Sequence, residues 1–413
     1  MSNAAWVEQD KPLNFPNVGG EEQPMRTQVA IIGAGPAGLL LGHLLRAEGI
    51  EVIVVERASA EYVLGRIRAG VLETTLTDLL HQLGIDQRLN AEGQLHDGFN
   101  LADGERLIRI DVAALTGRNV TVYGQTEVTR DLMDAAEGRG LQVFYDAADV
   151  ALHDIEGDAP YVTFTKDGAQ HRIDARFIAG CDGFHGPSRQ AIPASVARPF
   201  EKVYPFGWLG ILADVPPCNH ELIYANHANG FALASMRSHS RSRYYIQVPL
   251  DEKIEDWPDD RLWDELALRL GPDAAAHITR GPAIEKSIAP LRSFVFEPMR
   301  HGSLFLAGDS AHIVPPTGAK GLNLAASDVA YLTRALVAFF RRNDHDAIAG
   351  YSDKALARIW KSERFSWQLT MLMHRFPDQA PFDRRMQLAD LDYISSSVAA
   401  QTTIAENYVG LPL

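Results

Sequence analysis

Hydrophobic and polar positions divide the N-terminal part of the chain into three short elements. The apolar run Val29–Ile32 leads into a glycine-rich turn, a leucine-rich segment follows, and residues 52–55 form a second apolar run. Apolar runs of this length on either side of a helical pattern are typical of parallel strands joined by a crossover helix. We therefore expect a β-α-β unit over residues 28–56.

Apolar residues spaced three and four positions apart predict further helices along the chain. These helices are expected at 70–83, 127–139, 258–270, 321–342, 346–375 and 381–400. Shorter runs that are continuously apolar, or that alternate between apolar and polar residues, predict strands instead. These strands are expected at 142–152, 160–165, 176–183 and 303–308.

The pattern changes after about residue 204. Short runs with aromatic residues, separated by turn residues, predict an antiparallel sheet with strands at 206–213, 221–226, 231–235 and 243–249. We therefore expect an α/β (α+β) protein of two domains with a helical C-terminal region. The expected divisions are an arm at 1–24, a first domain at 25–203 completed by 290–325, a sheet domain at 204–289, and the helical region at 326–413.

The composition narrows the classes of partner. The chain has 413 residues and a net charge of −14, which argues against a nucleic-acid partner because phosphate binding needs concentrated positive charge. Small anionic ligands need only a local cationic pocket and stay possible. The chain has no apolar run of about 18 residues, so we expect no membrane span. Two cysteines, Cys181 and Cys218, indicate a reducing, cytoplasmic compartment.

Residues 1–24 are polar and contain proline. The first four residues resemble an expression-tag remnant, and acidic residues stand where a signal peptide would carry Lys or Arg. We interpret this segment as a flexible N-terminal arm, because chain termini are commonly poorly ordered. A structured, partner-binding arm is the alternative.

The glycine-rich turn has the spacing of a dinucleotide-binding site. Gly33 permits the tight turn, Gly35 lets the backbone approach a pyrophosphate, and Gly38 lets the helix pack against the strand. The phosphate would face the helix N-terminus, where unpaired N–H groups favour negative charge. Glu56 ends the second strand, at the distance where a carboxylate accepts a hydrogen bond from a ribose. The motif does not say which dinucleotide binds.

Two later strands deliver an aspartate at their carboxyl ends. The segments are Ala179-Gly-Cys-Asp-Gly183 and Leu304-Phe-Leu-Ala-Gly-Asp309, and a glycine-rich loop follows the second one and opens a helix. In an open α/β sheet, ligands bind at such strand ends. Either aspartate alone could equally be a helix cap. All three segments in this order favour a shared ligand site.

With these three motifs, the chain resembles the class A flavoprotein aromatic hydroxylases. The resemblance extends from Met25 to the C-terminus and includes the stretches 62–73, 120–130, 203–210, 242–245, 285–293 and 405–412. It implies a Rossmann-like FAD-binding domain of the glutathione-reductase type, an antiparallel-sheet substrate domain and a helical C-terminal interface region. It also implies a homodimer, and no metal.

The resemblance implies FAD as the bound cofactor. Arg68 corresponds to a residue near the pyrophosphate, and Arg243 to one that helps the flavin change position. The family has serine at the place of Ala37, so one hydroxyl contact to FAD is missing, at a cost of about 1 kcal/mol. The implied FAD-binding positions are Gly33, Gly35, Gly38, Glu56, Arg57, Arg66, Arg68, Gln125, Asp182, Arg243, Asp309, Gly318, Leu322 and Asn323.

The implied substrate is 4-hydroxybenzoate. Ser235, Arg237 and Tyr245 match the family's clamp for the carboxylate, and a guanidinium with two hydroxyls suits a planar anion. Without the resemblance, Arg237 would be read as a solvated surface arginine. The backbone carbonyl of Pro316 matches a contact near the substrate hydroxyl.

A proton relay is implied at the substrate's hydroxyl. Tyr224 matches the tyrosine that hydrogen-bonds this hydroxyl, and Tyr408 and His96 match the next members of the relay. A phenol and a tyrosine both have intrinsic pKa values near 10, so we expect protons to pass easily between them. A histidine, with a pKa near 6.5, is expected to exchange the proton with water. Alone, His96 would be read as an exposed or capping residue.

The implied reaction uses NADPH and O2. Hydride reduces FAD, O2 forms a flavin C4a-hydroperoxide, and the phenolate ring takes up one oxygen to give 3,4-dihydroxybenzoate. Ala58 stands where NADPH-dependent members carry glutamine, so NADH is the alternative reductant. The implied NADPH-binding positions are Arg57, Tyr62, Arg68, His185, Arg189 and Arg292.

Two other functions are compatible with the fold. A related flavin hydroxylase could act on a different phenolic acid, but it would be expected to lack the carboxylate clamp. A partner-binding protein that keeps the scaffold without catalysis would be expected to lose Asp182 or Asp309, and this chain keeps both.

Overall fold

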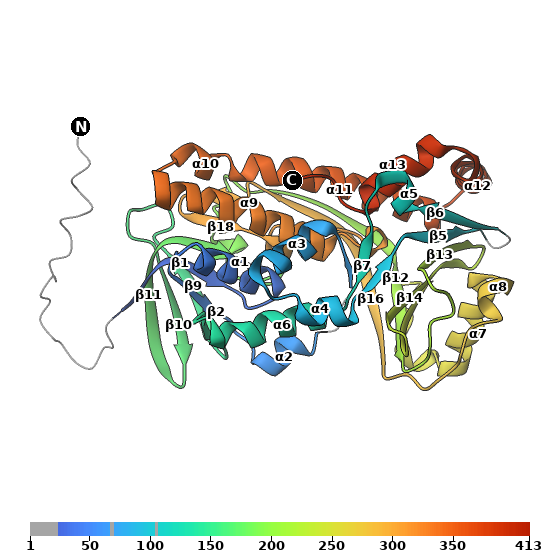
Figure 1. The fold of residues 1–413 in the computed structure, drawn as a ribbon, viewed down its shortest axis with the longest axis horizontal. Helices are drawn as coiled ribbons and strands as arrows, with labels where there is room; N and C mark the ends of the chain where they lie inside the picture. Colours follow the sequence, from blue (N-terminus) through green and yellow to red (C-terminus); the bar gives the residue numbers. More distant parts are fainter. Residues whose placement is uncertain (1–23, 67–69, 104–105) are drawn as a thin grey trace, which may run out of the picture.

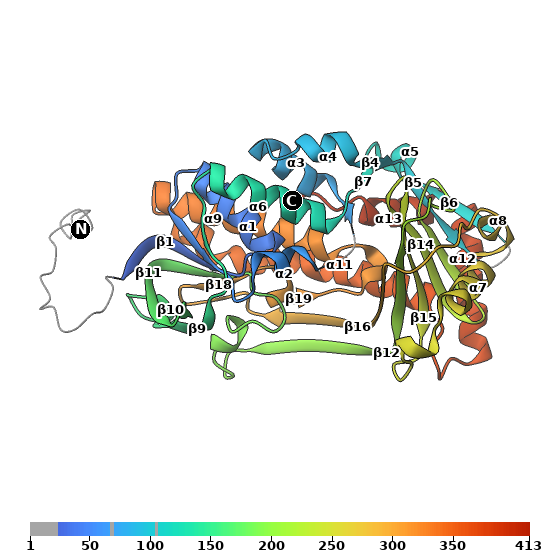
Figure 2. The ribbon, with the colours of Figure 1, turned by 90° about the horizontal axis from the view of Figure 1, so that it is seen from below.

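A computed structural model describes residues 24–66, 70–103 and 106–413. The predicted arm, apart from Pro24, and Arg68 lie outside the described residues. In the described part, the strands form two eight-stranded sheets and one three-stranded sheet. Figures 1 and 2 show the sheets at opposite ends of an elongated molecule, with C-terminal helices running along it.

The first sheet has a parallel centre. Its strands run in the order β17-β18-β11-β1-β2-β8, with β10 and β9 added antiparallel at β11. Ile32 pairs with Gly180, and Gly180 pairs with Leu306, so three neighbouring strands end level with one another. The strands are β1 (Met25–Ile32), β2 (Val52–Val55), β8 (Gln142–Phe144), β9 (Ala148–His153), β10 (Tyr161–Lys166), β11 (Ala169–Gly180), β17 (Arg300–His301) and β18 (Leu304–Leu306).

Helix α1 (Pro36–Ala47) packs against α6 (Gln125–Gly138) and α9 (Gly321–Arg342). Leucines of α1 are buried in one core cluster with the apolar residues of β1, β2 and β11. This burial is why the apolar runs of the sequence form the centre of the first sheet.

The second sheet is mostly antiparallel, in the order β19-β16-β12-β15-β14-β13-β5-β6. Strands β12 and β16 pair along most of their length, and Figure 2 shows them running along the middle of the molecule toward the second sheet. The strands are β5 (Gly98–Ala102), β6 (Leu107–Asp111), β12 (Arg198–Ala213), β13 (Ile223–His227), β14 (Gly230–Ser238), β15 (Arg241–Val248), β16 (Glu285–Glu297) and β19 (His312–Ile313).

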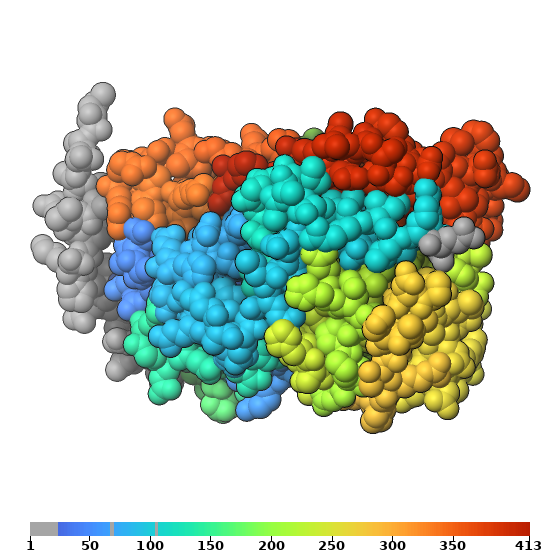
Figure 3. Space-filling view, turned by 45° about the vertical axis from the view of Figure 1, so that its right-hand side comes forward, coloured from blue at the N-terminus to red at the C-terminus, as the bar shows by residue number. Residues whose placement is uncertain are grey.

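The second sheet is covered on both faces. Helix α7 (Asp259–Leu270) buries Trp263 and Leu266 against one face, and α11 (Tyr351–Met373) contributes Phe365 and Leu369 to a cluster with residues of the other face. Figure 3 shows the C-terminal helices, in orange and red, along one edge above this region. Among the described helices, none is long and apolar enough to span a membrane.

The remaining elements are short or lie at the C-terminus. They are α2 (Ala60–Leu64), β3 (Val71–Leu72), α3 (Thr74–Leu83), α4 (Gln87–Glu92), β4 (Gln94–His96), α5 (Val112–Thr116), β7 (Val120–Val122), α8 (Pro272–Ala275), α10 (His345–Ala349), α12 (Pro381–Ser396), α13 (Val398–Tyr408) and the 3-10 turns η1 (Arg189–Ala191), η2 (Ile254–Asp256), η3 (Gly308–Ser310) and η4 (Pro316–Gly318).

Several predicted elements are divided in the structure. The helix predicted at 346–375 is interrupted at Gly350, and the one predicted at 381–400 ends before Ser397, whose side chain caps α13. The predicted strand 142–152 is divided into β8 and β9, with Asp146 and Asp149 at positive φ. The helix predicted from residue 70 begins at Thr74. In each case a local cap or turn interrupts a continuous apolar pattern.

Candidate active site

The glycine turn has the geometry that a close ligand approach needs. Gly33 has φ +101°, and a Cβ added there or at Gly38 would lie closer than 3.0 Å to backbone atoms. Gly38 would meet the carbonyl of Gly33 itself, so helix α1 packs directly on the turn. A Cβ at Gly35 would meet nothing within 4 Å, so this backbone faces open space.

Glu56 is held in place at the end of β2. Its carboxylate accepts hydrogen bonds from the backbone N–H groups of Ala34 (2.8 Å) and Ala58 (2.9 Å), which join the two strand ends. A cavity of about 320 Å³ lies beside it. The cavity is lined by Ile32, Gly33, Val55, Glu56, Arg57, Asp149, Val150, Asp182, His185, Gly186, Pro187 and Gln190.

Asp182 contributes a carboxylate to the same cavity. One oxygen accepts from the Ser188 N–H at 2.8 Å, and the other is buried and has no hydrogen-bond partner among the described residues. Burial raises the pKa of this carboxyl. A buried polar atom of this kind indicates a ligand or water partner. The cavity, the open backbone at Gly35 and this carboxylate therefore fit the adenosine end of FAD.

The third strand end, after β18, carries Asp309. The preceding Gly308 N–H donates to Asp328 at 2.9 Å, and Asp328 also pairs with His312 at 2.6 Å. Both Asp328 and His312 are buried. The turn that presents Asp309 is thus fixed to helix α9 from behind.

Two helix N-termini carry predicted FAD-binding residues. Gln125 is the first residue of α6 and Leu322 lies in the first turn of α9, and neither helix has a side-chain cap. The unpaired N–H groups of such a turn suit a phosphate or a carbonyl oxygen. The Asn323 side chain bonds Glu73 N–H and two carbonyl oxygens, so its predicted FAD contact would fall to its backbone.

Two of the predicted NADPH arginines, Arg189 and Arg292, are already engaged with protein groups. Arg189 donates to the carbonyls of Ser310 (3.0 Å) and Phe184 (2.6 Å), and burial lowers its pKa. Arg292 pairs with Glu201 at 3.2 Å. Both guanidinium groups lie over the Phe184 ring, at 4.6 and 4.9 Å from its centroid. The structure therefore brings Arg189 and Arg292 together around one aromatic ring.

The other predicted NADPH positions lie around the cavity. His185 is exposed, contacts Phe184 edge-on and lines the cavity together with Arg57. Tyr62 lies on α2 with 63% of its surface exposed, and Arg66 follows this helix at the surface. Neither Tyr62 nor Arg66 lines the cavity.

The predicted substrate residues Tyr224, Ser235 and Tyr245 share one face of the second sheet. Leu233 pairs with both Tyr224 and Tyr245 across the strands, and Ser235 pairs with Arg243. Arg237 lies where the pairing of β14 with β15 shifts register, so strand alternation does not place its side chain, but its guanidinium interacts with Tyr245. The sheet therefore brings the predicted clamp and Tyr224 together.

Arg237 is the cationic group of the predicted clamp. Burial lowers the pKa of its guanidinium, and interactions with Tyr245 oppose the shift. An incoming carboxylate would relieve this desolvation. Ser235 donates its hydroxyl proton to the Arg243 carbonyl at 2.6 Å, so it must rotate before it can donate to a carboxylate.

Arg243 lies beside the clamp in a different network. Its guanidinium bonds Glu285 at 2.9 and 3.3 Å and Ser287 at 3.0 Å, and it lies 5.1 Å from the centre of the Tyr245 ring. Burial acts to lower the pKa of its guanidinium, but Tyr245 and Glu285 outweigh this effect, so the pKa is raised overall. Arg243 thus stays cationic next to Tyr245 and Glu285.

Tyr224 and Tyr408 form a buried pair. Their hydroxyl oxygens lie 3.3 Å apart, and Phe99 stacks on Tyr408 at 4.1 Å. Burial raises the pKa of Tyr224 to about 12 and that of Tyr408 well above its usual value. Burial therefore moves the pKa of both tyrosines up from the intrinsic value near 10.

His96 lies at the end of β4 and is buried. Burial lowers its pKa to about 4, with the neighbouring His220 adding to the shift. The expected pKa near 6.5 is wrong, and so is the reading of His96 as exposed. Pro316 begins the turn η4, is exposed, and its carbonyl accepts from Ala319 N–H at 2.9 Å.

Comparison with known proteins agrees with this geometry. A family model described as "FAD binding domain" matches residues 26–366. The "p-hydroxybenzoate hydroxylase" of Acinetobacter baylyi is 58% identical over 391 residues, which cover 94% of this chain and 96% of the relative. The chain belongs to the p-hydroxybenzoate hydroxylase family. The predictions of an FAD cofactor and of a flavoprotein aromatic monooxygenase are therefore confirmed.

Solved structures with low sequence identity share the fold. The p-nitrophenol 4-monooxygenase PnpA of Pseudomonas putida DLL-E4 has a TM-score of 0.80 at 16% identity, covering 95% of this chain and 100% of that chain. P. aeruginosa PqsL, in complex with 2-aminobenzoylacetate, has a TM-score of 0.76 at 19% identity, and the match covers 89% of this chain and 99% of that chain. The predicted fold class of the p-hydroxybenzoate hydroxylase family is thus confirmed.

A buried charge cluster, which the sequence does not predict, lies next to the relay tyrosine Tyr408. Glu73 bonds Lys320 at 2.6 Å and Arg358 at 3.3 Å, and Lys320 also donates to the Tyr408 carbonyl at 2.9 Å. Burial lowers the pKa of Lys320. The cluster ties the loop before α9 to the relay tyrosine. A buried charge leaves no periodic pattern, so the sequence had no signal for it.

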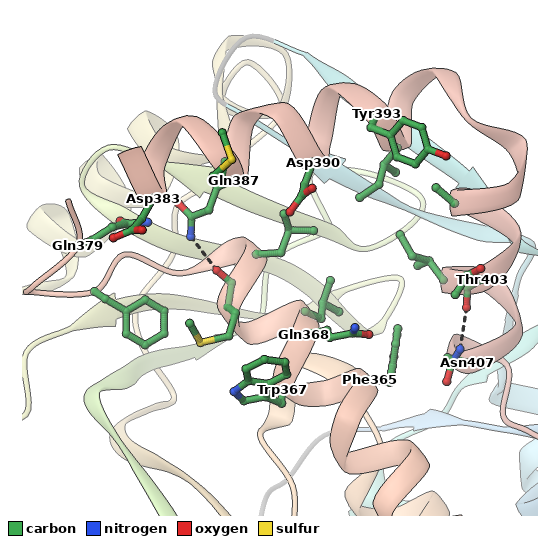
Figure 4. Close-up of a pocket in the computed structure, with 18 of the residues that line it drawn as sticks. Phe365, Trp367, Gln368, Gln379, Asp383, Gln387, Asp390, Tyr393, Thr403 and Asn407 are labelled. Carbon is green, nitrogen blue, oxygen red and sulfur yellow. Dashed lines mark hydrogen bonds between the residues drawn. The ribbon is translucent and has the colours of Figure 1, made fainter. Parts of the chain in front are cut away.

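A second cavity of about 740 Å³ lies among the C-terminal helices and is here called the C-terminal groove (Figure 4). Tyr393 of α12 and Trp367 of α11 border it, with 62% and 41% of their surfaces exposed. The groove is lined by Pro205, Phe365, Trp367, Gln368, Leu369, Met371, Leu372, Phe376, Pro377, Asp378, Gln379, Asp383, Met386, Gln387, Asp390, Tyr393, Ile394, Ala400, Thr403, Ile404 and Asn407.

Proposed function

We propose that the protein uses NADPH and O2 to hydroxylate 4-hydroxybenzoate at the 3-position, giving 3,4-dihydroxybenzoate. The observation that carries this proposal is the position of Tyr224 and Tyr245 on one sheet face, with the Arg237 guanidinium interacting with Tyr245. A cation at one end and an ionisable hydroxyl at the other suit a ring with a carboxylate and a hydroxyl in para positions. The 58% identity to an enzyme named p-hydroxybenzoate hydroxylase supports the same substrate.

The clamp residues would bind and orient the substrate. The Arg237 guanidinium offers parallel N–H donors to the carboxylate, and the Tyr245 and Ser235 hydroxyls add to them. The apolar side chains of the same face, such as Leu233 and Trp208, would exclude water from the ring.

Tyr224 would accept the proton that the substrate's hydroxyl loses. The resulting phenolate raises electron density at the neighbouring ring carbon, which is the position to be oxidised. Because Tyr224 lies 3.3 Å from Tyr408, the proton can move along the pair while neither phenol has to stay ionised. FAD, when bound, supplies hydride acceptance and the activation of oxygen.

FAD would be held by the three level strand ends and two helix N-termini. Glu56 and Asp182 would meet the adenosine end, and Asp309 and the start of α9 the flavin end. NADPH would approach over Phe184, where Arg189, Arg292 and His185 gather. Ala58 removes one polar group near this approach, so we propose NADPH with some use of NADH.

The test follows both half-reactions in the purified enzyme. 4-Hydroxybenzoate should accelerate NADPH oxidation and yield one 3,4-dihydroxybenzoate per NADPH. Tyr224→Phe should lower hydroxylation by about 10²-fold or more, because general base catalysis contributes that much. It should affect flavin reduction far less. Acceleration with hydrogen peroxide as the sole product would contradict the substrate, and equal losses in both half-reactions would contradict the role of Tyr224.

The clamp is tested separately. Arg237→Ala should weaken 4-hydroxybenzoate binding by roughly 10- to 100-fold, since hydrogen bonds to charged groups contribute about 1.5–3 kcal/mol. Arg237→Lys keeps the charge without the fork and should recover part of this loss. Unchanged binding in Arg237→Ala, measured by titration, would remove this residue from the clamp.

We further propose a cytoplasmic homodimer in which the C-terminal groove is covered by a second copy. Tyr393 and Met386 expose 62% and 44% of their surfaces, and exposed apolar patches of this kind mark interaction sites. Buried free thiols at Cys181 and Cys218 suit a reducing compartment. Sedimentation should give twice the chain mass of 45.5 kDa. Tyr393→Glu should halve that mass, while Leu268→Glu on α7 should not.

A further inference from the structure

His96 is poorly suited to be the last member of a proton relay. It is 1% exposed, and neither ring nitrogen has a hydrogen-bond partner among the described residues. With its pKa lowered to about 4, the ring is neutral near neutral pH and holds no extra proton. A neutral ring can still pass a proton, by accepting at one nitrogen while the other releases its own. It then needs a further group that reaches solvent.

His220 is placed to be that group. Its ring centre lies 5.8 Å from the centre of the His96 ring, at an interplanar angle of 37°, and the residue is exposed. A single water molecule can bridge a separation of this size. The exposed ring exchanges protons directly with buffer.

The segment that carries His220 is fixed on both sides. Asn219 donates to the Glu221 carbonyl at 2.8 Å, and Asn100 N–H of β5 donates to the Leu222 carbonyl at 2.8 Å. Glu221 itself is 7% exposed. His220 is therefore held beside His96 by the turn that leads into β13 of the second sheet.

Charged groups around the two histidines are paired. Glu221 accepts two hydrogen bonds of 2.8 Å from Arg109, which also bonds Asp111 at 2.6 Å, and Asp97 accepts from Asn119. Burial has the largest effect on both groups: it lowers the pKa of His96 and raises that of Tyr408. The Glu221 carboxylate acts to raise both pKa values. One carboxylate therefore lies within electrostatic range of both relay members.

We propose that His220 is the solvent-facing end of the proton path, receiving from His96 the proton that the substrate's hydroxyl gives up. This inference rests on the proposed function, which supplies the proton. One proton enters His96 from the tyrosine side and its other ring proton leaves toward His220, so the ring changes tautomer and gains no charge. His220 then releases a proton to water. It contacts neither substrate nor FAD and acts through His96.

The experiment uses the full-length enzyme with FAD and 4-hydroxybenzoate bound and no NADPH. A stopped-flow jump in pH is followed by the absorbance of the bound phenolate. His220→Gln should slow the change roughly 3- to 10-fold, less than the 10²-fold or more of a direct general base. His277→Gln, which removes another exposed imidazole just after α8, should leave the rate unchanged. Added imidazole should restore the rate of His220→Gln.

The His96→Gln variant, alone and combined with His220→Gln, separates this inference from the proposed function. His96→Gln should slow the change, and adding His220→Gln to it should have no further effect, because the two act in series. An unchanged rate in His220→Gln beside a slow His96→Gln would overturn the inference alone. So would a loss that imidazole fails to restore, or one that persists in the His96→Gln background. Unchanged rates in both single variants would refute the relay of the proposed function.

Discussion

The buried cluster around Glu73 allows a quantitative test of how the site is supported. Its carboxylate and the Lys320 ammonium are each 3% exposed and lie 2.6 Å apart, while Arg358 lies at 3.3 Å. Removing one partner of a buried pair costs about 3–5 kcal/mol, because the remaining charge is left uncompensated. In Lys320→Met, Arg358 still compensates the charge of Glu73 in part, so we expect the free energy of unfolding to fall by about 3 kcal/mol. Glu73→Gln leaves Lys320 and Arg358 without their carboxylate, so the free energy of unfolding should fall by about 4 kcal/mol or more.

The assay is urea unfolding of the FAD-loaded enzyme, with the two single variants and the double variant compared in a cycle. The double variant should lose less than the sum of the single losses by about 2 kcal/mol, since contacting residues couple by this order. Lys354→Met, an exposed lysine of α11, is the control and should change stability by less than about 0.5 kcal/mol. Additive losses, or a Lys320→Met variant that matches the control, would refute the reasoning.

Three further changes test the cofactor turn and the core. Gly38→Ala should prevent FAD binding because the new methyl would meet the Gly33 carbonyl, and normal FAD content after purification would contradict this. Gly35→Ala meets nothing within 4 Å, so it should keep the wild-type melting temperature but retain FAD less well on dialysis; equal retention would contradict a close ligand approach. Burial raises the pKa of Glu363 from 4.5 to about 7, so the folded state holds a proton that the unfolded state releases, and stability falls as pH rises through this window. Across this window the free energy of unfolding should fall by up to about 3 kcal/mol, and urea titrations of Glu363→Gln should not show this fall. An unchanged pH dependence in the variant would exclude Glu363 as its source.

The parallel half of the fold could be predicted because its signals are local. Gly33 and Gly38 stand where any Cβ would collide with backbone, so the spacing of the glycines itself encodes the turn. Asp182 and Asp309 follow buried strands, and the level ends of β1, β11 and β18 bring them to one edge. Here the strand pattern and the motif describe the same geometry.

Other features depend on contacts that the local pattern does not contain. Strand β5 joins the second sheet by pairing with β13, and β6 pairs with β5. Both strands stand far before β13 in the sequence, a separation much longer than the usual connection between paired strands. Lys320 and Glu73 are separated by 247 residues along the chain. The breaks at Gly350 and Ser397 come from helix caps inside continuous apolar periodicity. Long-range pairing and single capping residues thus account for most of the differences.

The acidities of the relay were also outside the reach of the sequence, and they change its mechanism. With Tyr224 raised to about 12 and His96 lowered to about 4, burial disfavours the charged form of each group. A charge stored on either side chain would cost several kcal/mol in this apolar cluster. In the proposed relay a proton would therefore cross by concerted exchange between neutral groups, with charge appearing only on the substrate's phenolate oxygen, beside Tyr224, and at the solvent. The rate of such a relay depends on the group at its exit, which is the reason that an exposed histidine next to His96 matters.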